Sequence, residues 1–116
     1  MSAARQQSLS MAVDDSYGLW ELLWGLHTDF PEAPPARLRS IARQVLAGLV
    51  REGLLTLTFG PAGGAEEPLA REQALAALDQ PGNWAAPGRL GDPETRFFAT
   101  AAGERAYFGQ TAPAER

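Results

Sequence analysis

The clearest pattern of apolar and polar positions lies between residues 35 and 59 of this 116-residue chain. Apolar residues recur there with the period of an amphipathic helix: Leu38, Ile41, Ala42, Val45, Leu46, Leu49 and Val50. Pro35 suits the first helical turn, because proline lacks an N–H that this turn would leave unbonded. Gly53 is expected just past the end, in the left-handed conformation. The pattern therefore predicts a helix from Pro35 to Glu52.

Two strands are predicted after this helix. Over residues 54–59 apolar and polar positions alternate, which is typical of a strand with one buried face. The apolar side consists of Leu55, Leu57 and Phe59 and the polar side of Thr56 and Thr58. A second strand is expected at residues 95–100, followed by a helical turn or two up to residue 108. We expect the strands to pair as an antiparallel ribbon around residues 60–94.

The insertion between the strands contains a predicted short helix at residues 69–78. Its inward residues are expected to be Ala74, Leu75 and Leu78. Glycine and proline punctuate the rest of the insertion, as in loops. Trp84 is a large apolar residue in such a loop, so we expect it to fill the edge of the core.

The opening helix is predicted for residues 16–28, with Asp15 or Ser16 as its N-cap. At ~100° per residue, its apolar residues cover roughly 220° of the circumference, which is wider than the stripe of a surface helix. They are Tyr17, Leu19, Trp20, Leu22, Leu23, Trp24 and Leu26. A helix of this kind is either central in a small core or shared with a partner.

The chain is expected to form a single α+β domain over residues 14–109, with about four helices and a two-stranded antiparallel ribbon. Residues 1–13 show no sustained apolar period, and we expect them to be disordered. Residues 110–116 are expected to fray in the same way.

Composition narrows the class of protein without naming an activity. The 45% hydrophobic and 21% charged content is that of an ordinary globular protein. The chain has no cysteine, and thus no disulfide framework or thiol nucleophile. A cytoplasmic protein is expected, because no stretch suits a signal peptide or a membrane span. The net charge of −4 argues against coating nucleic acid by bulk attraction.

Two segments resemble parts of the winged-helix domains of bacterial regulators. LVREGLLTL resembles the junction between a recognition helix and the first wing strand, and FFATAAGERAY resembles the second wing strand leading into a C-terminal helix. The resemblance implies a small winged-helix-like fold for residues 14–109. It also implies DNA binding or transcriptional regulation, with residues 35–52 as the DNA-reading helix. The layout also resembles that of small uncharacterised bacterial proteins with a tryptophan-rich first helix.

The arginines of residues 35–52 are the candidate DNA contacts: Arg37, Arg39, Arg43 and Arg51. Arginine matches the geometry of phosphate and guanine. A solvated polar face is the plainer interpretation of the same residues. Residues 29–34 are too few and too rich in proline to hold a further helix before this one. The DNA function therefore stays one of two alternatives.

The second alternative is a protein-interaction or homodimerisation module without DNA binding. Its candidate residues lie on one edge of the opening helix, at i, i+3, i+7 and i+10: Tyr17, Trp20, Trp24 and His27. Aromatics at this spacing are usual in a core, but tryptophan and tyrosine are also favoured anchors of interfaces. A small-ligand pocket is the remaining interpretation.

No catalytic, metal-binding or cofactor-binding group stands out. His27, Asp29 and Glu32 make a poor metal site, because one imidazole and two loop carboxylates do not match the usual ligand sets. The glycine-rich GPAGGAEE lacks the Lys-Ser/Thr end of a phosphate-binding loop. An enzyme is not expected, since the residue types of acid–base and nucleophilic catalysis are not clustered.

Overall fold

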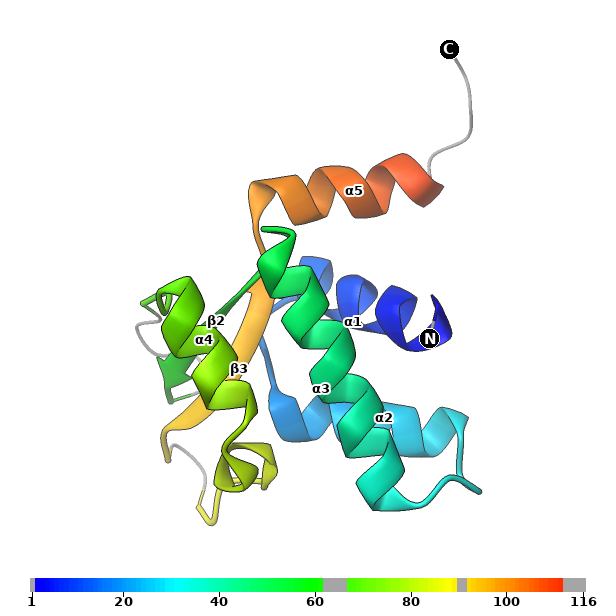
Figure 1. Ribbon diagram of the computed structural model, residues 1–116, viewed down its shortest axis with the longest axis vertical. Coiled ribbons are helices and arrows are strands. Elements are labelled where there is room, and N and C mark those ends of the chain that lie inside the picture. The colour runs from blue at the N-terminus through cyan, green and yellow to red at the C-terminus, as the bar shows by residue number, and fades with distance from the viewer. Residues whose placement is uncertain (1, 62–66, 90–91, 112–116) are drawn as a thin grey trace.

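The computed structural model describes residues 2–61, 67–89 and 92–111. In chain order its elements are α1 (Ser2–Asp14), β1 (Tyr17–Gly18), α2 (Leu19–Asp29), α3 (Pro35–Arg51), β2 (Leu55–Gly60), α4 (Arg71–Leu78), the 3-10 turn η1 (Pro81–Trp84), β3 (Glu94–Ala99) and α5 (Ala101–Thr111). Figure 1 shows α5 at one end of the molecule, and α2 with η1 toward the opposite end. These elements form an α+β domain, as the sequence pattern predicts.

The sheet has three antiparallel strands in the order β1–β3–β2. The predicted β2–β3 ribbon is present, with Leu57 opposite Phe97 and Thr56 opposite Phe98. The third strand, β1, pairs Tyr17 with Phe97. The expected two-stranded ribbon is thus corrected to three strands, and the described residues form five α-helices where about four are expected.

The long helix α3 follows its prediction closely. It runs from Pro35 to Arg51, and Gly53 follows it with φ 78°. This left-handed φ explains why glycine ends the helix, because other residues pay a steric cost there. The residues of the predicted stripe are buried except Ile41, which is half-buried.

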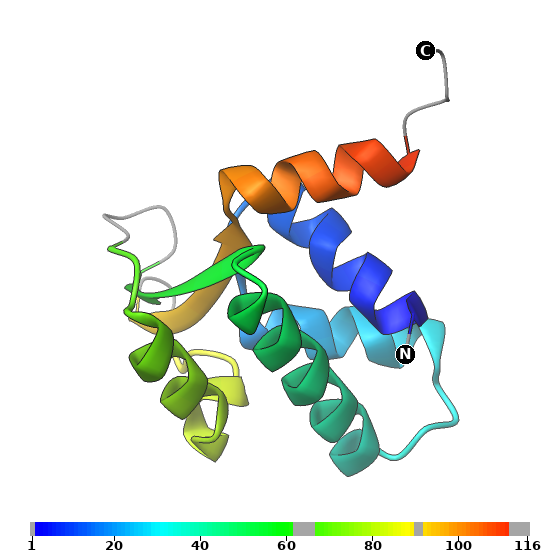
Figure 2. The ribbon, with the colours of Figure 1, turned by 45° about the horizontal axis from the view of Figure 1, so that its top comes forward.

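Helix α1 replaces the disorder expected for residues 1–13. Its buried residues recur with a helical spacing, but they are mostly small: Ala4, Ser8, Leu9 and Ala12. The Ser8 hydroxyl donates to the Ala4 carbonyl at 2.8 Å, which satisfies the buried polar group. Figure 2 shows α1 between α5 and α2. A stripe of alanine and serine adds little to a hydropathy pattern, which is why the sequence does not reveal this helix.

The opening helix begins three residues later than predicted. Residues 17 and 18 belong to β1, and α2 starts at Leu19 with Gly18 as its N-cap. The Gly18 N–H donates to the Glu21 carboxylate at 2.7 Å, which satisfies an unpaired donor of the first turn. A Cβ at Gly18 would lie 2.1 Å from Glu94 Oε1, so a larger residue here would displace the Glu94 side chain. Tyr17 and Gly18 pair with β3, although the apolar pattern predicts that they belong to the helix.

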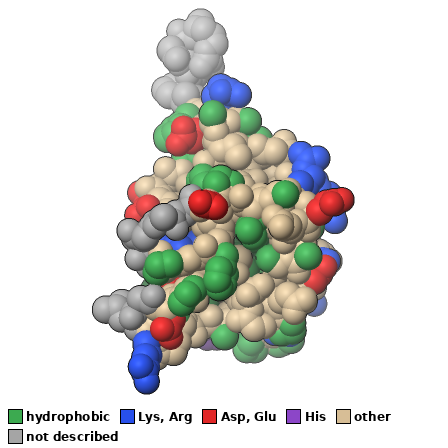
Figure 3. Space-filling view, turned by 90° about the vertical axis from the view of Figure 1, so that its left-hand side faces the viewer, with side chains coloured by type: hydrophobic (Ala, Val, Ile, Leu, Met, Phe, Trp, Pro, Cys, Tyr) green, Lys and Arg blue, Asp and Glu red, His purple; other side chains and the backbone are tan. Residues whose placement is uncertain are grey.

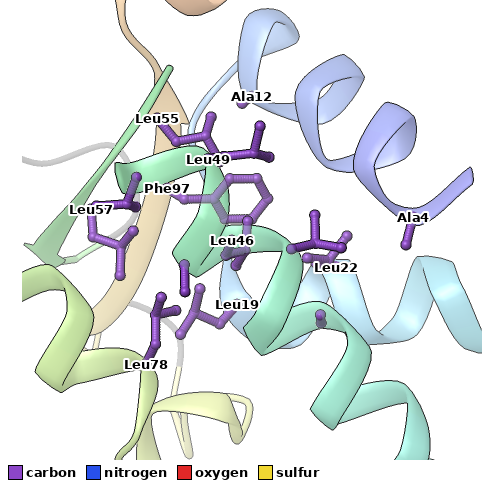
Figure 4. Packing of buried hydrophobic residues seen from close by; sticks show 14 of the residues in the cluster. Ala4, Ala12, Leu19, Leu22, Leu46, Leu49, Leu55, Leu57, Leu78 and Phe97 are labelled. Carbon is purple, nitrogen blue, oxygen red and sulfur yellow. The ribbon is translucent and has the colours of Figure 1, made fainter. Parts of the chain in front are cut away.

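The core lies between the helices and the ribbon. Phe97 of β3 is fully buried, and Figure 4 shows it among Leu46 and Leu49 of α3 and Leu57 of β2. Leu9, Leu19, Leu22 and Leu26 bring α1 and α2 into the same cluster. The wide apolar surface of the opening helix is therefore largely a core surface.

In the insertion between β2 and β3, α4 packs against α3 and η1 packs against α2. Trp84 is 5% exposed and its indole N–H donates to the Leu78 carbonyl at 2.9 Å, so the prediction that it fills the core edge is confirmed. Ala74 and Leu78 point inward as expected, whereas Leu75 is half-buried. Phe59 is 56% exposed and Thr58 is fully buried, so the predicted apolar and polar sides of β2 are wrong at these two residues.

Helix α5 covers the turn between α3 and β2. The Thr100 hydroxyl donates to the Gly53 carbonyl at 2.6 Å, and the Gly103 N–H donates to the Thr100 hydroxyl at 3.0 Å. The helix reaches Thr111, so it includes residues 110 and 111 of the segment expected to fray. Residues 112–116 lie outside the described part of the chain.

Candidate functional site

The four candidate arginines lie on different sides of α3. Arg39 and Arg43 share an edge, as their spacing predicts, and this edge faces α4 and η1. Arg37 and Arg51 are exposed near opposite ends of the helix, ~21 Å apart along its axis. The four side chains therefore do not form one cluster.

Arg43 has a partner within the protein. Its Nε donates to Asp79 Oδ1, which links α3 to the end of α4. This hydrogen bond raises the pKa of Arg43 and lowers the pKa of Asp79 below its ordinary 3.8. Because the lowered pKa is that of an acid, the pair stabilises the fold above about pH 4 and is lost as the pH falls further. Arg43 thus acts in packing α4 onto α3.

A polar strip occupies the solvent-facing side of α3. At ~100° per residue, its four members fall within about 60° of the circumference: Arg37, Ser40, Gln44 and Arg51. All four are exposed, and no carboxylate lies on the strip. Ser40 and Gln44 were not among the expected contacts, although the helical period places them beside Arg37 and Arg51.

The acidic residue that follows the strip is paired. Both guanidinium nitrogens NH1 and NH2 of Arg5 donate to Glu52, each at 3.0 Å. The hydrogen bond from Arg5 lowers the pKa of Glu52, so this carboxylate is ionised but matched by a cation. The strip of α3 therefore ends beside a neutral ion pair.

Three of the four aromatic-edge residues meet at one hollow. Trp20, Trp24 and His27 line a space of about 300 Å³ that also touches Trp84. Tyr17 does not belong to this group, because it lies in β1 and its hydroxyl donates to Asp14 at 2.7 Å. Trp84 was missed as a member, since its place in the sequence, 60 residues from Trp24, gives no sign of this contact.

Trp20 is held by a largely buried group of charges. Its indole N–H donates to Glu94 Oε1 at 2.8 Å, and Arg96 NH1 lies 3.1 Å from Glu94 Oε2. Arg96 Nε also donates to the Ser16 hydroxyl at 3.0 Å. The Arg96 side chain is 9% exposed, so these hydrogen bonds are protected from water. The group fixes the ring of Trp20 and joins the start of α2 to β3.

Within residues 2–61, 67–89 and 92–111, no group of three or more His, Cys, Asp or Glu residues has the geometry to hold a metal ion. No helix in this part of the chain is long and apolar enough to cross a membrane. In comparisons with protein-family models, curated proteins and solved structures, none matches this chain.

Proposed function

We propose that this chain is a non-enzymatic, winged-helix-like protein that binds DNA through α3. The order of elements supports this class: α2 and α3 are consecutive helices joined by residues 30–34, and the β2–β3 ribbon follows. A helix-turn-helix consists of two helices joined by a short turn, with the second in the major groove. The sequence pattern predicted only one helix before α3. Because α1 is an additional helix at the start of the chain, α2 can serve as the short helix that precedes the recognition helix.

The polar strip of α3 is the observation that carries the proposal. Arginine reads guanine, glutamine reads adenine, and serine hydrogen-bonds to either. Arg37, Gln44 and Arg51 are exposed on one side, with no acidic residue among them. Since the chain carries a net charge of −4, attraction to phosphate must be local to this strip. On the face in Figure 3, acidic and basic side chains are mixed and form no extended positive patch.

The proposal is tested by fluorescence anisotropy of a labelled mixed-sequence duplex at low and moderate salt. We expect micromolar binding that weakens with salt, because non-specific affinity comes from phosphate neutralisation. The double variant Arg37→Ala, Arg51→Ala should reduce the slope of log K against log salt by about 2.

The matched control is Arg105→Ala, which removes one exposed arginine from α5. It should leave the affinity almost unchanged. Absence of binding at ~50 µM in low salt, where even weak non-specific binders associate, would contradict the DNA function. A reduction of the slope by about 1 in Arg105→Ala, half that of the double variant, would show bulk attraction and no specific use of α3.

A protein-interaction module is the second candidate, and Trp24 favours it. Its side chain is 71% exposed, whereas Trp84 in the same hollow is 5% exposed. Exposed tryptophan beside a hollow is a frequent anchor in interfaces. For self-association through this surface, the mass from analytical ultracentrifugation should rise with concentration, and Trp24→Asp should abolish the rise. A constant monomer mass up to high micromolar concentration would exclude the homodimer.

A further inference from the structure

A continuous groove runs along the first half of α3, between this helix and the η1 turn of the insertion. It consists of three adjoining hollows of about 300, 290 and 320 Å³. Trp84 lines all three, Leu23 and Pro35 line the first two, and Arg39 lines the last two. The insertion therefore does more than connect β2 to β3, because its η1 turn forms one wall of this groove.

One end of the groove is aromatic. All three tryptophans of the chain line the first hollow. The indole N–H groups of Trp20 and Trp84 are used within the protein, by Glu94 and by the Leu78 carbonyl, which fixes both rings. The Trp24 indole N–H donates to no acceptor among the described residues. Trp24 therefore offers both an apolar face and a donor to a ligand.

The other end of the groove is cationic. Arg39 is exposed and forms no ion pair with the described residues. The charges of Arg43 and Asp79 cancel in their ion pair, so Arg39 gives this end a net charge of +1. A carboxylate is the complementary ligand, because arginine forms its strongest hydrogen bonds with carboxylates and phosphates.

We propose that this groove binds an extended, proline-containing acidic peptide segment of a partner protein. Aromatic-lined grooves bind polyproline segments, whose backbone is already extended and loses little entropy on binding. Proline offers carbonyl acceptors and no N–H donor, which matches the donor of Trp24. An acidic residue further along the segment pairs with Arg39. This proposal names the partner of the Trp24 surface and rests on the protein-interaction function.

The test uses the full chain and a fluorescein-labelled eight-residue probe of alternating prolines and alanines that ends in two glutamates. Binding is followed by anisotropy. We expect saturable binding that weakens at least about tenfold in Trp24→Ala, as for an interface hot spot. Replacing the prolines by glycines should also abolish binding. In Arg39→Ala the glutamate probe should weaken, whereas a probe ending in two alanines should bind both proteins equally.

The control variant is Phe59→Ala, which truncates an exposed aromatic residue on β2, away from the groove. It should bind the probe like the unaltered chain, and far-UV circular dichroism should show the same helix content in all variants. No saturation at about 1 mM probe, or equal binding by Trp24→Ala, would overturn the peptide proposal. If the probe did not bind but the molecular mass from analytical ultracentrifugation rose with protein concentration, the protein-interaction function would stand. The occupant of the groove would then be a second copy of the chain.

Discussion

Arg96→Met is expected to lower the free energy of unfolding by about 3–5 kcal/mol, because removing one member of a buried charge group leaves its partners uncompensated. Glu94 would then keep its carboxylate close to Glu21 without the cation between them. The hydrogen bonds to Ser16, which join the start of α2 to β3, would be lost as well. Urea denaturation followed by circular dichroism measures the change.

Arg71→Met is the matched control, since Arg71 is exposed at the start of α4. Its effect should stay within about 0.5 kcal/mol. The double variant Arg96→Met, Glu94→Gln should recover part of the loss, because the amide removes one of the two unmatched charges. A loss below about 1 kcal/mol in Arg96→Met would mean that water reaches the group and screens it.

Leu9→Ala is expected to lower the free energy of unfolding by about 2–5 kcal/mol, the usual range for a large-to-small change in a core. Leu9 is fully buried and belongs to the main hydrophobic cluster, although it lies in the segment that the sequence pattern indicates as disordered. The same denaturation experiment decides between the two descriptions of residues 1–13.

Gln6→Ala provides the comparison on the same helix, because Gln6 is exposed. It should change stability by no more than about 0.5 kcal/mol. If Leu9→Ala were as neutral as Gln6→Ala, α1 would not contribute to the folded core.

The two proposed surfaces of α3 use different arginines, so their variants serve as mutual controls. Arg37 and Arg51 of the polar strip lie outside the three hollows of the groove, whereas Arg39 lines two of them and Ser40, at the edge of the strip, lines one of those two. Trp24→Ala should therefore leave DNA affinity unchanged. Conversely, the Arg37→Ala, Arg51→Ala variant should bind the peptide probe normally. A variant that binds neither DNA nor the peptide probe would indicate a general loss of structure.

The sequence was most informative where periodicity and local chemistry agree. The stripe of α3 and the left-handed Gly53 are local features that the structure shows. The strand β2 is also present, but its predicted alternation holds only as far as Leu57, because Thr58 is buried and Phe59 is exposed. Trp84 was also placed correctly, because a tryptophan in a loop has few positions other than a core edge. In each case the physical cause is contained within a few neighbouring residues.

The candidate site was only partly visible in the sequence, because it depends on contacts between distant segments. The spacing of Arg39 and Arg43 shows that they share an edge, but not that Asp79 lies opposite Arg43. The spacing of Trp20 and Trp24 shows one helix face, but not that Trp84 completes it. The sequence also does not distinguish Arg37 and Arg51 from the other arginines of α3. The structure does, because α4 packs beside α3 and pairs with Arg43, whereas Arg37 and Arg51 stay exposed.

By itself, the sequence determined an α+β domain built around one amphipathic helix and an antiparallel ribbon, because both patterns follow from the repeat of the backbone. Only the tertiary structure decided that residues 2–14 form a helix and that Tyr17 joins the sheet. The first depends on alanines that are buried only by neighbouring helices. The second depends on hydrogen bonds to a strand about 80 residues away, which outweigh the local preference for helix.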